Sequence, residues 1–163
     1  MPSYVFGSKD GLYQAVMERA FAAPSELAAE LGSHLGGKNP GEALALLVGA
    51  YIDFLAAQPT YVRLIQRASM EDSDRLGRIA AHEHAVGEGL SVLANLVDVN
   101  GFRSVDPRQL FISIVALCFF PMSHQATLLG PLGYDSHDPN FLAERGTHVT
   151  NLLLSGLTGG RAT

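Results

Sequence analysis

The 163-residue sequence contains a single cysteine, no tryptophan and few charged residues. Cys118 has no second thiol with which to form an intrachain disulfide, and no Cys–His cluster with zinc-site spacing occurs. Charged side chains make up 17% of the residues, whereas hydrophobic side chains make up 47%. Because a monomer covers its surface with polar groups, this composition predicts that a partner or a ligand covers some apolar surface.

Basic charge and long apolar runs are also scarce. The net charge of −5 argues against non-specific adhesion to nucleic acid or to an anionic membrane surface. The longest apolar run, residues 114–122, is too short to span a bilayer. The N-terminus lacks the basic and apolar regions of a signal peptide, so we expect a cytoplasmic protein without membrane contact.

Glycine, proline and Asn/Asp residues divide the chain into six predicted helices. Ser8 is the expected N-cap of the first helix, which Pro24 either bends or interrupts before it ends at Leu35. Asn39 and Asp106 are expected N-caps because each stands before a proline at the first helical position. The other predicted helices cover residues 40–58, a short segment from 59, 73–99, 107–129 and 139–159. No alternating strand pattern occurs, which predicts an all-α fold.

The predicted helix 107–129 is apolar on nearly every side between residues 110 and 120. A helix that is apolar all round has to be buried all round. Together with the broad apolar surface of the last helix, it predicts a four-helix interface between two copies of the chain, burying on the order of 2,000 Å² or more. The alternative is that this helix is the central helix of a monomer. The residues expected at the dimer interface are Phe111, Phe120, His124, Leu128, His148 and Leu152.

The sharpest motif is YVFGSKDGLY at residues 4–13. It resembles the segment of tetracycline-repressor-like (TetR) transcriptional regulators in which the DNA-recognition helix runs into the fourth helix. There the pattern is aromatic-x-Phe-Gly-Ser-Lys-Asp/Glu-x-Leu-Tyr/Phe. The predicted order of helices resembles the family over the whole chain, although only this segment carries a motif.

The resemblance implies that residues 1–8 are a remnant of the helix-turn-helix DNA-binding domain and that residues 9–163 form the ligand-binding and dimerisation domain. In the family, the residues that match Tyr4 and Lys9 contact DNA phosphates. Such contacts position the protein on DNA without reading the base sequence. Alternatively, Tyr4 packs on the core and Lys9 is solvated. The family reads DNA with about three N-terminal helices, most of which this chain lacks. We therefore expect no specific DNA binding by the chain as given.

The resemblance also implies a ligand pocket within the helical body. Such pockets are mostly apolar with a few polar groups that fix orientation. We expect Pro121 to bend its helix and to open space beside Met122, whose flexible side chain fits ligands of different shapes. Ordinary core packing or solvent exposure is the alternative for every candidate. The candidate lining residues are Leu47, Tyr51, Phe54, Leu64, Val86, Leu90, Cys118 and Met122, and the candidate polar groups are Arg67, His82 and Gln125.

Neither a metal site nor catalysis is indicated. His82 and His84 stand two apart on a helix and point in different directions, whereas helical metal pairs need a spacing of three or four. Gly-Ser-Lys at residues 7–9 lacks the spacing of a phosphate-binding loop. We expect no cofactor, no metal and no enzymatic activity.

The predicted function is therefore ligand sensing and dimerisation within a TetR-like regulator, most simply a repressor, with an apolar or aromatic effector. The first helix would be the lever that joins the DNA-binding end to the pocket wall. The alternatives are a stand-alone helical module that binds an apolar small molecule and a structural dimer with a filled core.

Overall fold

The computed structural model describes residues 7–71, 74, 79–99, 102 and 105–158. It contains no strand in these residues, which confirms the all-α prediction. Two short turns follow α7, namely the π-helical turn η1 (Gln125–Leu129) and the 3-10 turn η2 (Gly130–Leu132). The six α-helices of the described residues are α2 (Lys9–His34), α3 (Pro40–Ala57), α4 (Pro59–Glu71), α6 (Ala80–Val99), α7 (Pro107–Ser123) and α8 (Pro139–Thr158).

Side-chain caps start three of these helices as the sequence predicts. The Ser8 side chain accepts a backbone N–H at the start of α2, and the Asp106 side chain does so at the start of α7. Asn39 and Glu42 form a reciprocal capping box at α3, in which the Glu42 N–H donates to Asn39 Oδ1 over 2.9 Å. Each cap satisfies amides that have no partner inside the helix.

The structure settles one open boundary and corrects two others. α2 continues through Pro24 as one helix of 26 residues. The predicted end of the fifth helix at Leu129 is wrong, because α7 ends at Ser123 and the η1–η2 segment turns away by 80°. The predicted start of the fourth helix at residue 73 lies outside the described residues, but Ile79 is not helical and α6 begins only at Ala80.

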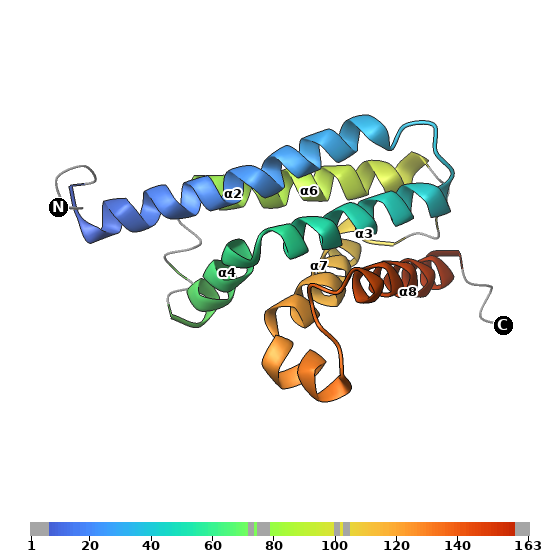
Figure 1. The fold of residues 1–163 in the computed structure, drawn as a ribbon. Helices are drawn as coiled ribbons and strands as arrows, with labels where there is room; N and C mark the ends of the chain where they lie inside the picture. Colours follow the sequence, from blue (N-terminus) through green and yellow to red (C-terminus); the bar gives the residue numbers. More distant parts are fainter. Residues whose placement is uncertain (1–6, 72–73, 75–78, 100–101, 103–104, 159–163) are drawn as a thin grey trace.

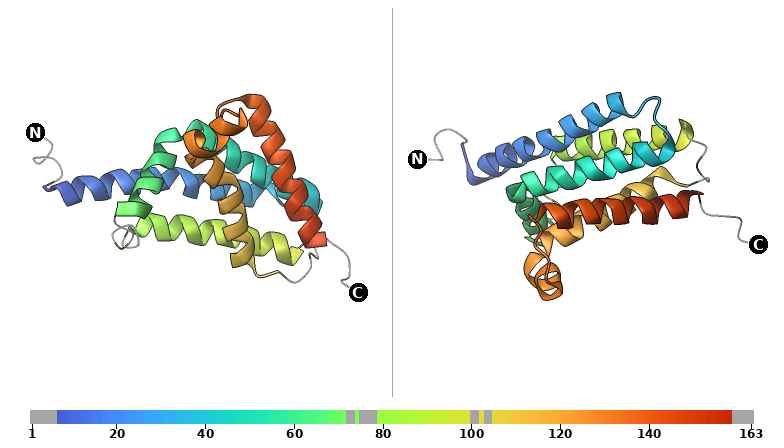
Figure 2. Two further views of the ribbon diagram at one scale, coloured as in Figure 1. Left: turned by 90° about the horizontal axis from the view of Figure 1, so that it is seen from below. Right: turned by 45° about the vertical axis from the view of Figure 1, so that its right-hand side comes forward.

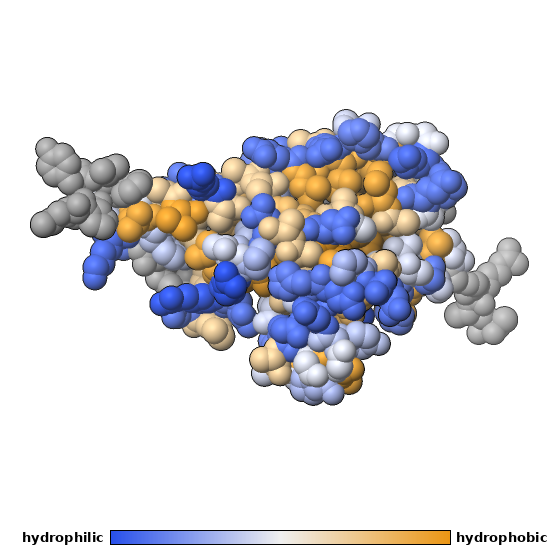
Figure 3. Space-filling model, in the orientation of Figure 1, coloured by the Kyte–Doolittle hydropathy of each residue, from blue (hydrophilic) through white to orange (hydrophobic). Residues whose placement is uncertain are grey.

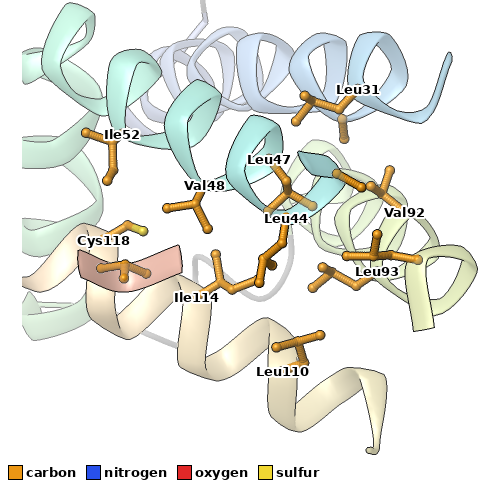
Figure 4. Packing of buried hydrophobic residues seen from close by; sticks show 14 of the residues in the cluster. Leu31, Leu44, Leu47, Val48, Ile52, Val92, Leu93, Leu110, Ile114 and Cys118 are labelled. Atoms are coloured by element: carbon orange, nitrogen blue, oxygen red, sulfur yellow. The ribbon is translucent and has the colours of Figure 1, made fainter. Parts of the chain in front are cut away.

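The helices form layers that bury two separate hydrophobic clusters. α2 and α6 lie side by side, and α3 packs against α8 with α7 crossing behind them (Figures 1 and 2). The larger cluster, here called the major core, includes 18 buried residues of the described ranges and centres on α3 (Figure 4). The smaller cluster, here called the minor core, joins the N-terminal half of α2 to α4 and to the start of α6; it contains Met17, Phe21, Ala68, Ile79 and Ala85.

α3 is the helix of the described residues that is long and apolar enough to cross a membrane by length and composition. The bent pair of α7 and η1–η2 meets the same test only if it is counted as one span. Six residues of α3 are buried, and they pack into the major core against α7 and α8. α3 therefore has the contacts of a core helix.

Candidate ligand cavity

A cavity of about 310 Å³ lies where the major and minor cores meet. This volume is at the lower end of the range of small-molecule sites, roughly 300–1,000 Å³. On the face shown in Figure 3, apolar side chains gather between α2 and α3, which both contribute to the cavity wall. The lining residues are Phe21, Pro24, Leu27, Ala28, Leu31, Leu47, Tyr51, Tyr61, Ile65, His82, Ala85, Val86, Gly89, Val92, Leu93, Phe111, Ile114, Val115 and Phe119.

Each long helix contributes one face to this wall. The lining positions of α2 recur at three and four residues from Phe21 to Leu31, and those of α6 do so from His82 to Leu93. This is the spacing of one helix face, which the sequence builds from apolar residues. The same faces carry buried residues of both cores, so the cavity continues the core packing.

Four rings of the wall and one ring beside it form a continuous row, here called the aromatic row: Tyr51, Phe54, Tyr61, Phe21 and His82. The centroids of Tyr51 and Phe54 are 6.5 Å apart, and those of Phe54 and Tyr61 are 5.2 Å apart. Phe21 packs edge-on against Tyr61 at 5.8 Å and against His82 at 4.8 Å. Aromatic pairs of this kind contribute about 0.5–1.5 kcal/mol each beyond area burial. The row therefore fixes the orientation of the rings relative to one another.

The polar groups of the wall are neutral at pH 7. Burial raises the pKa of Tyr61 to about 12. Burial also raises the pKa of Tyr51, and the neighbouring Tyr61 and Cys118 raise it further. Burial lowers the pKa of His82 below its ordinary value. The two phenols thus keep their protons, whereas the imidazole carries no charge.

Four of the predicted ligand residues, Leu47, Tyr51, His82 and Val86, lie together in the cavity wall. Phe54 lies outside the set of lining residues and joins two of the lining rings within the aromatic row.

The other predicted ligand residues lie elsewhere. Cys118 is buried within the major core, where burial raises the pKa of its thiol to about 12, and Met122 packs against the same core. Leu64 packs against the minor core, and Leu90 is half-buried outside the cavity wall. Two predicted polar groups make other contacts: Arg67 is exposed and pairs with Glu71 at 2.9 Å, and Gln125 hydrogen-bonds to Tyr134 O and Ser136 N.

Sequence reasoning missed several rings of the wall. Phe21 and Tyr61 belong to apolar helix faces, but the sequence does not show which face meets a cavity. Phe111, which the sequence predicts at the dimer interface, is one of the rings that line the cavity. Its ring lies so close to α6 that a Cβ atom on Gly89 would stand 2.8 Å from Phe111 Cε2. A glycine at residue 89 is the signal that could have indicated this close approach.

The remaining residues expected at the interface lie on α7, on α8 and in the segment that links these two helices. Phe120 is 52% exposed and its ring stacks on His124 with centroids 4.0 Å apart. Leu128 lines a shallow groove of about 690 Å³ between α7, η1–η2 and α8. His148 and Leu152 are exposed on α8.

A polar clasp joins α8 to α7 beside this groove. Pro121 has no N–H, so the carbonyl of Leu117 lacks its usual helical donor. Arg145 on α8 donates to this carbonyl through Nη2 at 2.7 Å and through Nε at 3.2 Å. The clasp therefore replaces a missing helical hydrogen bond with a bond between two helices.

The predicted phosphate-contacting residues lie at the start of the chain. Tyr4 lies outside the described residues, and Lys9 is exposed at the first position of α2. His84 points to Glu88, with Nε2 and Oε1 3.1 Å apart. Within the described residues, no group of three or more His, Cys, Asp or Glu side chains is placed to hold a metal ion.

Comparison with known proteins relates this chain to a family model and to a repressor. The family model described as "Tetracyclin repressor-like, C-terminal domain" matches residues 40–153. The HTH-type transcriptional repressor NicS of Pseudomonas putida is 25% identical to this chain over 159 residues, which are 94% of this chain and 74% of NicS. The matched range of the family model runs from α3 into α8 and includes most of the cavity wall.

Proposed function

Because the chain belongs to the tetracycline-repressor-like family of transcriptional regulators, whose members are regulators and not enzymes, we propose that it senses an apolar small molecule and pairs with a second copy of itself. In this proposal residues 9–163 are the ligand-binding and dimerisation domain of a cytoplasmic repressor, and residues 1–8 belong to its DNA-binding part. The observation that carries the proposal is the uncharged cavity between the two cores.

The position of α2 links the cavity to the DNA-binding end. α2 begins within the segment that resembles the family's junction with the recognition helix, and its residues Phe21 to Leu31 line the cavity. A ligand that fits one arrangement of α2 better than another shifts the balance between them by its difference in affinity. In a protein with the DNA-binding helices, Tyr4 and Lys9 would contact DNA phosphates and move with α2.

Apolar side chains on the outer face of α7 support pairing with a second copy. Ile112, Ala116 and Phe120 are four residues apart and exposed, which places them on one side of the helix. Leu152 on α8 is also exposed, whereas Val149 and Leu157 of the same helix are buried in the major core. We therefore propose an interface formed by α7 and α8 that includes Phe120, His124, Leu128, His148 and Leu152.

A matched pair of charge substitutions tests the interface. Leu152→Glu places a carboxylate at the proposed interface, whereas Leu46→Glu places one at an exposed position of α3. A buried, unpaired carboxylate opposes association, but a solvated one does not. Sedimentation velocity at micromolar concentration should show dimers for the wild type and for Leu46→Glu, and monomers for Leu152→Glu. A monomeric wild type, or a Leu152→Glu variant that stays dimeric, would contradict the proposal.

A further inference from the structure

We infer that the cavity binds an uncharged aromatic compound of one or two rings that carries a hydrogen-bond acceptor. This inference rests on the proposed ligand-sensing function and adds the chemistry of the ligand. It draws on four features of the wall: its volume, its lack of charge, its unpartnered phenols and its row of rings.

The volume limits the size of the ligand. An apolar cavity of about 150 Å³ in another protein holds benzene. The present cavity, at about 310 Å³, is roughly twice as large. Two fused six-membered rings with a small substituent therefore fit, but a bulky polycyclic compound does not.

The wall offers no counter-ion. Among the described residues, no side chain that lines the cavity is Asp, Glu, Lys or Arg. Two charged groups outside the wall already have partners: Arg145 donates to the Leu117 carbonyl, and Glu88 accepts from Ser25 Oγ at 2.9 Å. An ion that leaves water without an opposite charge bears a large desolvation cost. The cavity therefore favours neutral compounds over carboxylates and amines.

The two tyrosine hydroxyls provide the polar recognition. In the described part of the chain, no group forms a hydrogen bond with the Oη atom of Tyr51 or of Tyr61. Both phenols line the cavity and belong to the aromatic row. Neither oxygen is among the fully buried atoms that lack a partner, so each hydroxyl is accessible and can donate its hydrogen to an oxygen or nitrogen of a ligand.

The aromatic row favours a flat ligand with aromatic edges. Rings pack against rings in offset-stacked or edge-to-face arrangements, because the ring face is negative and the ring edge is positive. Phe21, Tyr61 and His82 already adopt such arrangements with one another. Phe111 and Phe119 on α7 add two further rings to the wall.

Three probes of nearly equal shape test the inference: naphthalene, naphthalene-2-carboxamide and naphthalene-2-carboxylate. Calorimetric titration of the whole chain at pH 7.5 should show that the carboxamide binds at least about tenfold more tightly than the carboxylate, because only the carboxylate brings an uncompensated charge.

Two variants test the phenols separately. Tyr51→Phe and Tyr61→Phe should each weaken carboxamide binding about three- to tenfold and leave naphthalene binding unchanged, because each removes one donor and keeps the ring. Tyr134→Phe is the matched control, since Tyr134 is exposed and outside the cavity wall, and it should change neither affinity. Thermal unfolding should confirm that all three variants fold.

The possible failures are distinguishable. A carboxylate that binds as tightly as the carboxamide would overturn the inferred neutrality and leave ligand sensing intact. Carboxamide affinity that is unchanged in both tyrosine variants would overturn the inferred acceptor. If no probe binds up to its solubility limit, both the inference and the proposed ligand-sensing function are wrong.

Discussion

The major and minor cores differ in size and in what they hold together. Among the described residues, the major core has 18 buried residues, drawn largely from α3, α6 and α7, whereas the minor core has five, from α2, α4 and the region where α6 starts. Hydrophobic stabilisation grows with the apolar area that is buried. The major core therefore determines most of the stability of the domain. The minor core holds the N-terminal half of α2, the part nearest to the DNA-binding end of the family's proteins.

The two prolines inside α2 and α7 differ in whether another helix bonds to the carbonyl that each proline leaves without its helical donor. At Pro121, Arg145 donates to the Leu117 carbonyl and thereby fixes α7 to α8. At Pro24, which lines the cavity, no described side chain donates to the Ala20 carbonyl that the missing N–H leaves free. α7 is thus hydrogen-bonded to α8 at the point where Pro121 removes a helical hydrogen bond. α2 has no such bond at Pro24, so it can bend where it lines the cavity.

The largest expected difference between the cores comes from truncating one fully buried residue in each. Leu44→Ala, in the major core, should lower the free energy of unfolding by about 3–5 kcal/mol. Met17→Ala, in the minor core, should lower it by about 2 kcal/mol and speed hydrogen exchange of the N-terminal half of α2, because that half can open locally. Urea unfolding and native-state exchange measure both effects. Equal losses without local opening would show that the two cores unfold as one unit.

Removal of the Arg145 clasp should have the next largest effect on the free energy of unfolding. Arg145→Met should lower the free energy of unfolding by about 1–3 kcal/mol, because the Leu117 carbonyl loses its donors. The same change should cost less in a Pro121→Ala background, where the backbone N–H of residue 121 can bond to that carbonyl. Arg67→Met, which removes only an exposed pair with Glu71, should leave stability nearly unchanged. An identical cost of Arg145→Met in both backgrounds would show that the clasp does not compensate for the proline.

The smallest expected effect comes from two glycines of α6. Gly87→Ala should raise the free energy of unfolding by about 0.5–1 kcal/mol, because its Cβ meets open space and alanine is the better helix former. Gly89→Ala has the same backbone benefit, but it pushes the Phe111 ring and should stabilise less. Naphthalene titration should show weaker binding to Gly89→Ala and unchanged binding to Gly87→Ala. Equal behaviour of the two variants would place Phe111 outside the ligand site.

Local sequence signals predicted much of the fold. Ser8, Asn39 and Asp106 marked helix starts because a cap acts within a few residues of itself. The end of α7 was missed although Pro121 and the polar residues 123–125 mark it locally, whereas the Arg145 bond to the Leu117 carbonyl, which joins α8 to α7, leaves no such mark. That contact joins residues far apart in the sequence, and no local pattern reports it.

The cavity wall was predictable only in part. Tyr51 and His82 lie on apolar helix faces and were found, but Tyr61 and Phe111 were not, because the crossing of the helices decides which face meets the cavity. Arg67 was proposed for the cavity although Glu71 stands four residues away, a spacing that favours a surface ion pair.

Hydrogen exchange of α2, with and without bound naphthalene-2-carboxamide, tests most directly whether the cavity joins the two cores. Bound ligand should slow exchange of α2 amides on both sides of Pro24, because Phe21 and Leu27 both contact the cavity, and should also slow exchange at the start of α6. Slower exchange confined to α7 and α8, with α2 unchanged while the compound is bound, would contradict a ligand that acts on α2.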